Sequence, residues 1–154
     1  MTTTTTIGLH KTEDLMTALH SWAPLFGRAC LSVIFIMSGV GKLAALSATA
    51  GHMRAEGMFA VPLFLFLAIF FELAGGLSIL LGFGARWGAL ALFCFLIPVT
   101  YVFHDFWTYE GMERQMQTIQ LMKNLAIMGG LTFVFTFGSG PKSLDAARGQ
   151  TSTK

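Results

Sequence analysis

Four long apolar segments constrain this chain more than any other feature of its sequence. They cover residues 24–46, 61–82, 85–103 and 119–137, and each is close to the roughly 20 residues that cross the hydrocarbon core of a bilayer as a helix. Only 12% of the 154 residues are charged, whereas soluble domains carry about 25%. The segments are continuously apolar rather than alternating, which is typical of membrane helices and not of barrel strands. The sequence therefore predicts an all-α integral membrane protein with four helices.

The segments outside the apolar windows predict the domain organisation. Residues 1–22 are expected to form a disordered or interfacial tail, residues 23–138 a single four-helix transmembrane domain, and residues 139–154 a polar C-terminal tail. The turn at 82–86 is so short that the second and third helices must be antiparallel neighbours. We therefore expect an up-down four-helix bundle, with residues 111–118 forming a short interfacial helix before the fourth span.

Basic residues near the helix ends predict how the bundle is oriented. Six lie on the side of the two termini: Lys11, Arg28, Arg86, Lys142, Arg148 and Lys154. Four lie on the opposite side: Lys42, Arg54, Arg114 and Lys123. This asymmetry predicts that both termini are cytoplasmic and that the longer connections, 47–60 and 104–118, are on the outer side.

One carboxylate lies in the middle of the second apolar segment. Glu72 is roughly 11 residues, hence ~16 Å, from the outer end of its helix at helical rise. Helical spacing places it on one face with Ala68, Gly75 and Gly76, and small residues mark faces where membrane helices approach closely. Because a bare carboxylate near the bilayer midplane is costly, we expect Glu72 to point into the bundle and to be neutral, paired or hydrated.

Polar residues on the other three helices are candidate partners for Glu72. Lys42 and Lys123 each lie about one turn from the outer end of a helix, ~6 Å deep, and His104 ends the third helix on the same side. We expect these four residues to converge in one outward-opening pocket, where Glu72 would transfer a proton. Three further residues complete the candidate ligand-binding set: Ser38, Tyr101 and Trp107.

Simpler interpretations of the same residues stay open. The two lysines could extend to the outer interface, and His104 could cap its helix. Glu72 could form an ion pair that only sets the helix register, since buried pairs are weak evidence for stability.

The sequence carries no complete cofactor motif. It has no flavin motif, no cysteine set for an Fe–S cluster, no pair of axial haem ligands and no clustered metal ligands. The net charge of +2 is spread along the chain and does not indicate nucleic-acid binding. Any redox role would therefore need electrons from a partner protein.

Four sequence motifs carry a resemblance to a known family. They are GRACLSVIFIMSGVGKL (27–43), ELAGGLSILLGFGARWGALAL (72–92), HDFW (104–107) and KNLAIMGGLTFVFTFGSGPKSLD (123–145). Together they resemble the DoxX family of small bacterial four-helix membrane proteins, over about residues 27–145. The resemblance implies a four-helix bundle in the bacterial cytoplasmic (inner) membrane. It implies no established set of cofactor ligands.

The resemblance and the polar residues leave three functions open. The family takes its name from a subunit of a membrane thiosulfate:quinone oxidoreductase, so the first is a quinone-linked or redox-complex-associated subunit in which Lys or His donates to a carbonyl and Glu72 handles the proton. The second is a non-catalytic anchor or assembly subunit. The third is a proton or small-molecule carrier, which ranks last because the chain has no inverted repeat. Whether the chain is itself an enzyme, and its oligomeric state, are not decided by the sequence.

Overall fold

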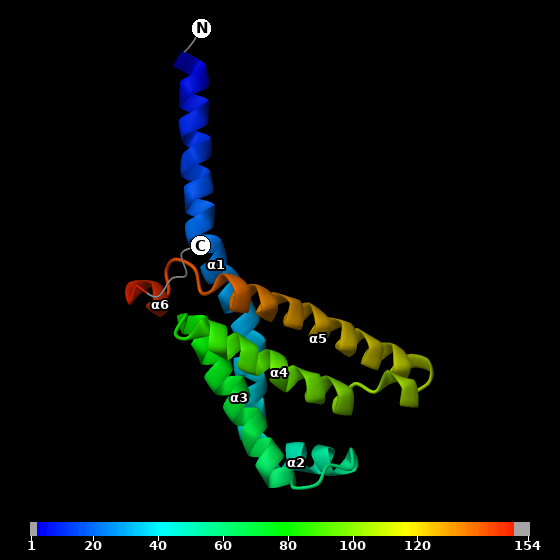
Figure 1. Ribbon diagram of the computed structural model, residues 1–154. Coiled ribbons are helices and arrows are strands. Elements are labelled where there is room, and N and C mark those ends of the chain that lie inside the picture. Colours follow the sequence, from blue (N-terminus) through cyan, green and yellow to red (C-terminus); the bar gives the residue numbers. More distant parts are fainter. Residues whose placement is uncertain (1–2, 150–154) are drawn as a thin grey trace.

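The computed structural model describes the backbone of residues 3–149 and the side chains of residues 12–149. Four long helices dominate it (Figure 1): α1 (Thr3–Ala44), α3 (Val61–Leu81), α4 (Ala85–Phe103) and α5 (Gly111–Phe137). Shorter elements connect or follow them: α2 (Leu46–Ala55), the 3₁₀ turn η1 (Phe106–Thr108) and α6 (Leu144–Ala147). The described residues contain no strand, so the prediction of an all-α fold is confirmed.

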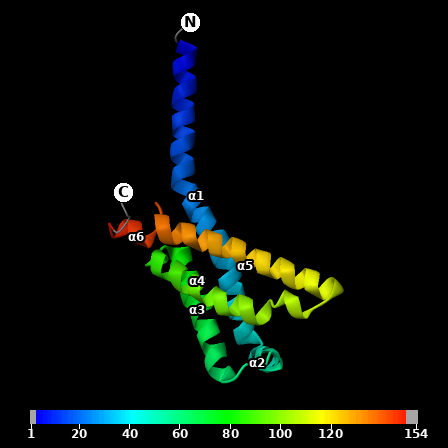
Figure 2. The same ribbon diagram turned by 45° about the vertical axis from the view of Figure 1, so that its right-hand side comes forward.

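The long helices form a bundle in the order of the chain. α1 packs on α3, α3 on α4 and α4 on α5, whereas α1 and α5 touch much less. The first part of α1 projects alone beyond the other helices, and α6 lies beside the α3–α4 turn in both ribbon views (Figures 1 and 2). The bundle is therefore least closed between its first and last long helices.

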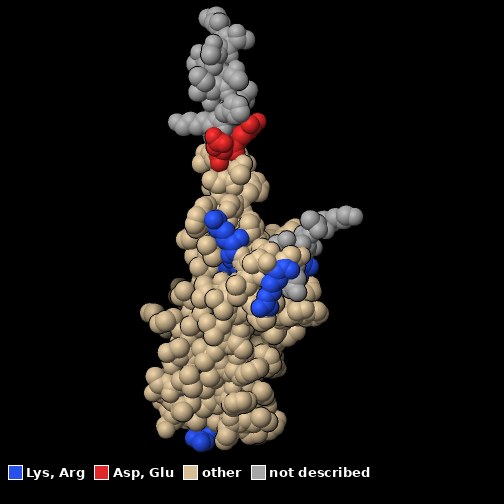
Figure 3. All heavy atoms as spheres, turned by 90° about the vertical axis from the view of Figure 1, so that its left-hand side faces the viewer, with Lys and Arg blue, Asp and Glu red and all other residues tan. Residues whose placement is uncertain are grey.

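The predicted membrane spans are confirmed by length and composition. Helical stretches long and apolar enough to cross a bilayer cover Thr12–Ala44, Val61–Leu81, Ala85–Thr108 and Gly111–Phe137. Figure 3 shows a broad side of the molecule without charged side chains, with Lys and Arg gathered above and below it. An uncharged belt between charged ends is what a surrounding bilayer requires.

The structure differs from the predicted boundaries at three places. α1 runs back to Thr3 through much of the segment 1–22 that we expected as a tail, and α2 occupies most of the predicted connection 47–60. Residues 111–118 are helical as expected, but they are the first turns of α5 rather than a short helix of their own, because α5 runs unbroken from Gly111 to Phe137. Met, Glu, Arg and Gln in this stretch all favour helix, and no proline interrupts it.

The core forms where small residues let the helices approach each other. The buried residues of α3 include Ala68, Glu72, Gly75 and Gly76, so the inward face predicted for this helix is confirmed. A Cβ on Gly75 would lie 2.6 Å from Leu92 Cγ on α4. Glycine is therefore required there for α3 and α4 to pack at this distance.

Candidate functional site

The centre of the candidate site is an ion pair between α1 and α3. Lys42 Nζ lies 2.8 Å from Glu72 Oε1 and 2.9 Å from Oε2, and the two side chains are 24% and 7% exposed. Contact with both carboxylate oxygens compensates part of the cost of removing each charge from water. The structure thus pairs Glu72 with Lys42, one of the two partners that the sequence left open.

Ser38 completes this cluster one helical turn from Lys42. Its hydroxyl donates to Glu72 Oε1 at 3.0 Å and accepts from Lys42 Nζ at 2.7 Å. Residues four apart share a helix face, so α1 presents the hydroxyl and the ammonium together to α3. We refer to Ser38, Lys42 and Glu72 as the Lys42–Glu72 cluster.

The Lys42–Glu72 cluster faces a cavity of about 430 Å³. His104, at the end of α4, and Lys123, on α5, line the same cavity. The structure therefore places Lys42, Glu72, His104 and Lys123, one from each long helix, around one space.

Two polar side chains beside the cluster differ in how they are held. His104 Nδ1 lies 3.0 Å from Gln117 Oε1, and an amide oxygen only accepts, so Nδ1 carries the hydrogen and Nε2 is left for another partner. Lys123 is exposed, and the structure gives it no hydrogen bond or ion pair within the described part of the chain. Both side chains are thus available to a molecule in the cavity.

Two predicted site residues lie elsewhere. Tyr101 and Trp107 are 70% and 53% exposed, do not line the cavity, and pack against each other with ring centroids 5.7 Å apart. They lie where an aromatic belt at the membrane interface is expected. The expectation that they join the cavity came from their closeness to His104 in sequence, which does not fix the direction of a side chain.

The structure adds polar residues to the cavity that were not in the predicted set. His52 and Thr49 come from α2, and Gln117, Gln120 and Asn124 come from α5. Asn124 is buried and donates to Thr100 Oγ1 at 2.9 Å, which joins α5 to α4. The α2 residues could not be found from sequence because that segment was expected to be an irregular connection. The α5 residues could have been found, because a helical period of 3.6 residues from Glu110 onward places them on one face.

A second, apolar cavity adjoins the first. Its volume is about 680 Å³ and it lies mainly between α3 and α4. Five residues line both cavities: Met53, Ala68, Phe95, Val99 and Phe103. The polar cavity around the Lys42–Glu72 cluster is therefore separated from an apolar one by a single layer of side chains.

Comparison with known proteins assigns the family. The DoxX family model matches residues 23–105, which is more than half of the chain and includes α3 and α4. The chain belongs to the DoxX family. A second model, described as the SURF4 family, matches residues 76–150. No solved structure matches the chain significantly.

Two curated relatives agree with membership of the DoxX family. The chain is 34% identical to Inner membrane protein YqjF of Escherichia coli (strain K12), over 84% of this chain and 95% of the relative. It is 26% identical to Inner membrane protein YphA of the same organism, over 79% of this chain and 86% of the relative. With the four membrane-spanning helices, these relatives identify the chain as a multi-pass inner membrane protein.

The DoxX match contains most of the candidate site. Ser38, Lys42, Glu72 and His104 lie within residues 23–105, whereas Lys123 lies outside it and within the SURF4 match. The described residues contain no group of three or more His, Cys, Asp or Glu side chains that could hold a metal ion. The ionisable groups of this DoxX-family site are thus one ion pair, two imidazoles and one unpaired ammonium group.

Proposed function

We propose that this DoxX-family protein is a membrane subunit that binds a quinone headgroup beside the Lys42–Glu72 cluster and works with a redox complex. The observation that carries the proposal is that a paired carboxylate, an imidazole and an unpaired ammonium group line one cavity among membrane-spanning helices. Ionisable residues at such positions are costly and mark functional sites by default.

The size and donors of the cavity fit such a headgroup. Small-molecule pockets measure about 300–1,000 Å³ and are mostly apolar with a few polar groups, and this cavity measures about 430 Å³. Lys123 offers hydrogen-bond donors to a carbonyl oxygen, and Nε2 of neutral His104 offers an acceptor to a ring hydroxyl. A flat ring whose oxygens are carbonyls when oxidised and hydroxyls when reduced would use both.

The Lys42–Glu72 cluster would hold the proton that accompanies reduction. A bound quinone supplies two-electron, two-proton chemistry, with electrons from a separate protein. Glu72 can accept or release a proton, and Lys42 stabilises the carboxylate form while Ser38 orients it through Oε1. The three residues would therefore hold and orient the transferred proton, whereas His104 and Lys123 would bind the quinone headgroup.

The adjoining apolar cavity supports an amphiphilic ligand. It is lined by Met, Phe, Val and Leu side chains and shares five residues with the polar cavity. A polar head beside Glu72 would thus lie next to an apolar space between α3 and α4 that suits a hydrocarbon tail.

The proposal is tested by purifying the protein from its native membrane in a mild detergent and extracting quinones for mass spectrometry. We expect stoichiometric quinone with the wild-type protein and its loss in Glu72→Gln and in Lys123→Gln. Glu113→Gln and Arg114→Gln are matched controls, because both residues are exposed on α5 and do not line the cavity. Retention of quinone in all four variants, or its absence from the wild-type protein, would contradict the proposal.

A non-catalytic anchor or assembly subunit is the second candidate. The projecting part of α1 favours it, because Leu15, Met16 and Leu19 are exposed there beyond the other helices (Figure 2). The same purification decides between the two functions. Stoichiometric partner proteins without quinone, lost when Leu15 and Leu19 are replaced by Ser, would support the anchor.

A further inference from the structure

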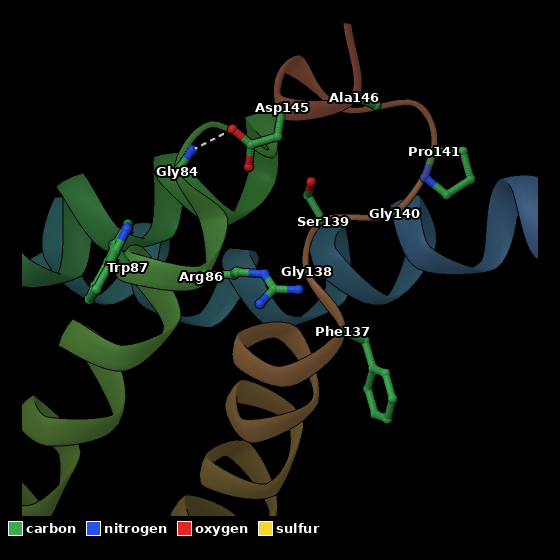
Figure 4. Close-up of a pocket in the computed structure, with 10 residues that line it drawn as sticks. All are labelled: Gly84, Arg86, Trp87, Phe137, Gly138, Ser139, Gly140, Pro141, Asp145 and Ala146. Atoms are coloured by element: carbon green, nitrogen blue, oxygen red, sulfur yellow. Dashed lines mark hydrogen bonds between the residues drawn. The ribbon is translucent and has the colours of Figure 1, made fainter. Parts of the chain in front are cut away.

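A second candidate site lies at the other end of the bundle, where the chain after α5 folds back onto the α3–α4 turn. Asp145 N donates to Gly82 O at 2.8 Å, and the Asp145 carboxylate accepts from Gly84 N at 2.8 Å and Ala85 N at 3.2 Å. These bonds fix the C-terminal segment against the start of α4. Between them lies a pocket of about 560 Å³ (Figure 4).

The guanidinium group of Arg86 lies in this pocket without a partner. Figure 4 shows it pointing across the pocket toward Gly138, away from the Asp145 carboxylate. The side chain is half-buried, and no hydrogen bond or ion pair is recorded for it within residues 12–149. Asp145 forms no ion pair with Arg86, and its carboxylate oxygens instead accept from Gly84 N and Ala85 N. A free guanidinium in a pocket is a ready site for an anion.

The charge around the pocket also favours an anion. Four basic residues of the described chain gather at this end: Arg28, Arg86, Lys142 and Arg148, with Asp145 as the facing carboxylate, which leaves a local excess of three positive charges. Arg28 does not line the pocket; its Nη2 donates to Lys142 O at 2.8 Å, whereas its Nε and Nη1 are buried without a hydrogen-bond partner in the described residues. Figure 3 shows basic side chains gathered near this end.

Aromatic side chains around the pocket place it at the level of lipid headgroups. Trp87 and Phe137 line the pocket and are 73% and 69% exposed. Trp22, on α1, lies under Lys142 Nζ, which is 3.9 Å from its ring centroid. Tryptophan with nearby cations is typical of the boundary between hydrocarbon and headgroups.

We propose that this pocket binds the phosphate of an anionic phospholipid. Arg86 donates two parallel hydrogen bonds to the phosphate oxygens, which suits the fork of a guanidinium. The acyl chains lie along the exposed rings of Trp87 and Phe137, which face the bilayer. A free phosphate ion would use the same guanidinium but would gain nothing from these two rings.

The test uses the full chain, delipidated in detergent and titrated with phosphatidylglycerol or phosphatidylcholine under native mass spectrometry. We expect phosphatidylglycerol to bind more tightly than phosphatidylcholine, and Arg86→Gln to weaken it about tenfold through loss of a charge-assisted contact. Arg86→Lys is expected to lie between the two, because it keeps the charge and loses the fork. Arg114→Gln, at the opposite end of α5, is the matched control and should bind like the wild-type protein.

A second measurement does not depend on how the Arg86 variants fold. In Trp107→Phe the remaining tryptophans are Trp22 and Trp87, both near the pocket. Phosphatidylglycerol with brominated acyl chains should quench their fluorescence more than brominated phosphatidylcholine does in vesicles of matched composition. Equal quenching by the two lipids would overturn the proposal. Equal binding of phosphatidylglycerol by the wild-type protein and Arg86→Gln would also overturn it. Displacement of the lipid by millimolar inorganic phosphate would overturn it too, because it would show a site for free phosphate.

Discussion

Lys42 Nζ lies within 2.9 Å of both carboxylate oxygens of Glu72, and this ion pair joins α1 to α3 inside the helical bundle. Glu72 is buried, and both side chains of the pair line the cavity. One interaction thus holds two helices together and presents a charged group to the candidate site. Both roles can be separated by mutation.

Lys42→Met is expected to destabilise the bundle by about 3 kcal/mol, because it leaves a carboxylate buried without its partner. Replacing both residues, Lys42→Met with Glu72→Leu, should recover most of that loss, since no charge then stays in the core. Equilibrium unfolding in mixed detergent micelles measures both effects. If the single variant were as stable as the wild-type protein, the pair would have no structural role.

Gly75→Ala is expected to destabilise the packing of α3 on α4. The new Cβ would lie 2.6 Å from Leu92 Cγ, and Leu92 is fully buried, so the helices must shift at a cost of about 1–3 kcal/mol. Gly129→Ala is the matched control, because nothing lies within 4 Å of a Cβ there. It should be neutral or stabilising by about 0.5–1 kcal/mol, since alanine favours helix over glycine. Equal melting temperatures for the two variants would contradict this account.

Asp145→Ala is expected to cost about 1–2 kcal/mol, the range for loss of a helix cap. Its carboxylate binds the first amides of α4, where the positive end of the helix dipole also lies, and no other side chain caps that helix in the described structure. Asp14→Ala, on the projecting part of α1, should leave the melting temperature unchanged. Hydrogen exchange at Gly84 and Ala85 gives a local measure, and unaltered protection there in Asp145→Ala would exclude the capping role.

Tyr109 should titrate above the ordinary range of tyrosine. Its pKa is raised first by Glu56 and then by Asp105, because nearby negative charge disfavours the phenolate. Tyr101→Phe leaves Tyr109 as the one tyrosine of the chain, so its absorbance at alkaline pH can be followed directly. Adding Glu56→Gln should lower the pKa, whereas adding Asp14→Asn should not. An unchanged titration after Glu56→Gln would show that the Glu56 carboxylate does not lie close enough to Tyr109 to act on it.

The sequence predicted the parts of this fold that depend on local chemistry. Continuous apolar runs can only be buried in a bilayer as helices, so the spans of α3 and α4 were placed within one residue. Small residues spaced by three and four predicted the inward face of α3, because helices can pack closely only where their facing side chains are small. The same logic failed for α2, which was taken for an irregular connection, and it did not predict that residues 111–118 continue directly into the fourth span.

The tertiary structure decided which polar residues meet. Lys42 and Lys123 are similar in sequence, each a lysine about one turn from a helix end, yet Lys42 pairs with Glu72 while Lys123 stays unpaired beside the same cavity. The difference arises because α1 packs closely on α3, whereas α5 packs mainly on α4. Tyr101 and Trp107 turn outward for a similar reason, since the rotation of α4 and η1 is set by their packing against α5. Local sequence determines that a residue lies on a helix, and only the contacts between helices determine what it faces.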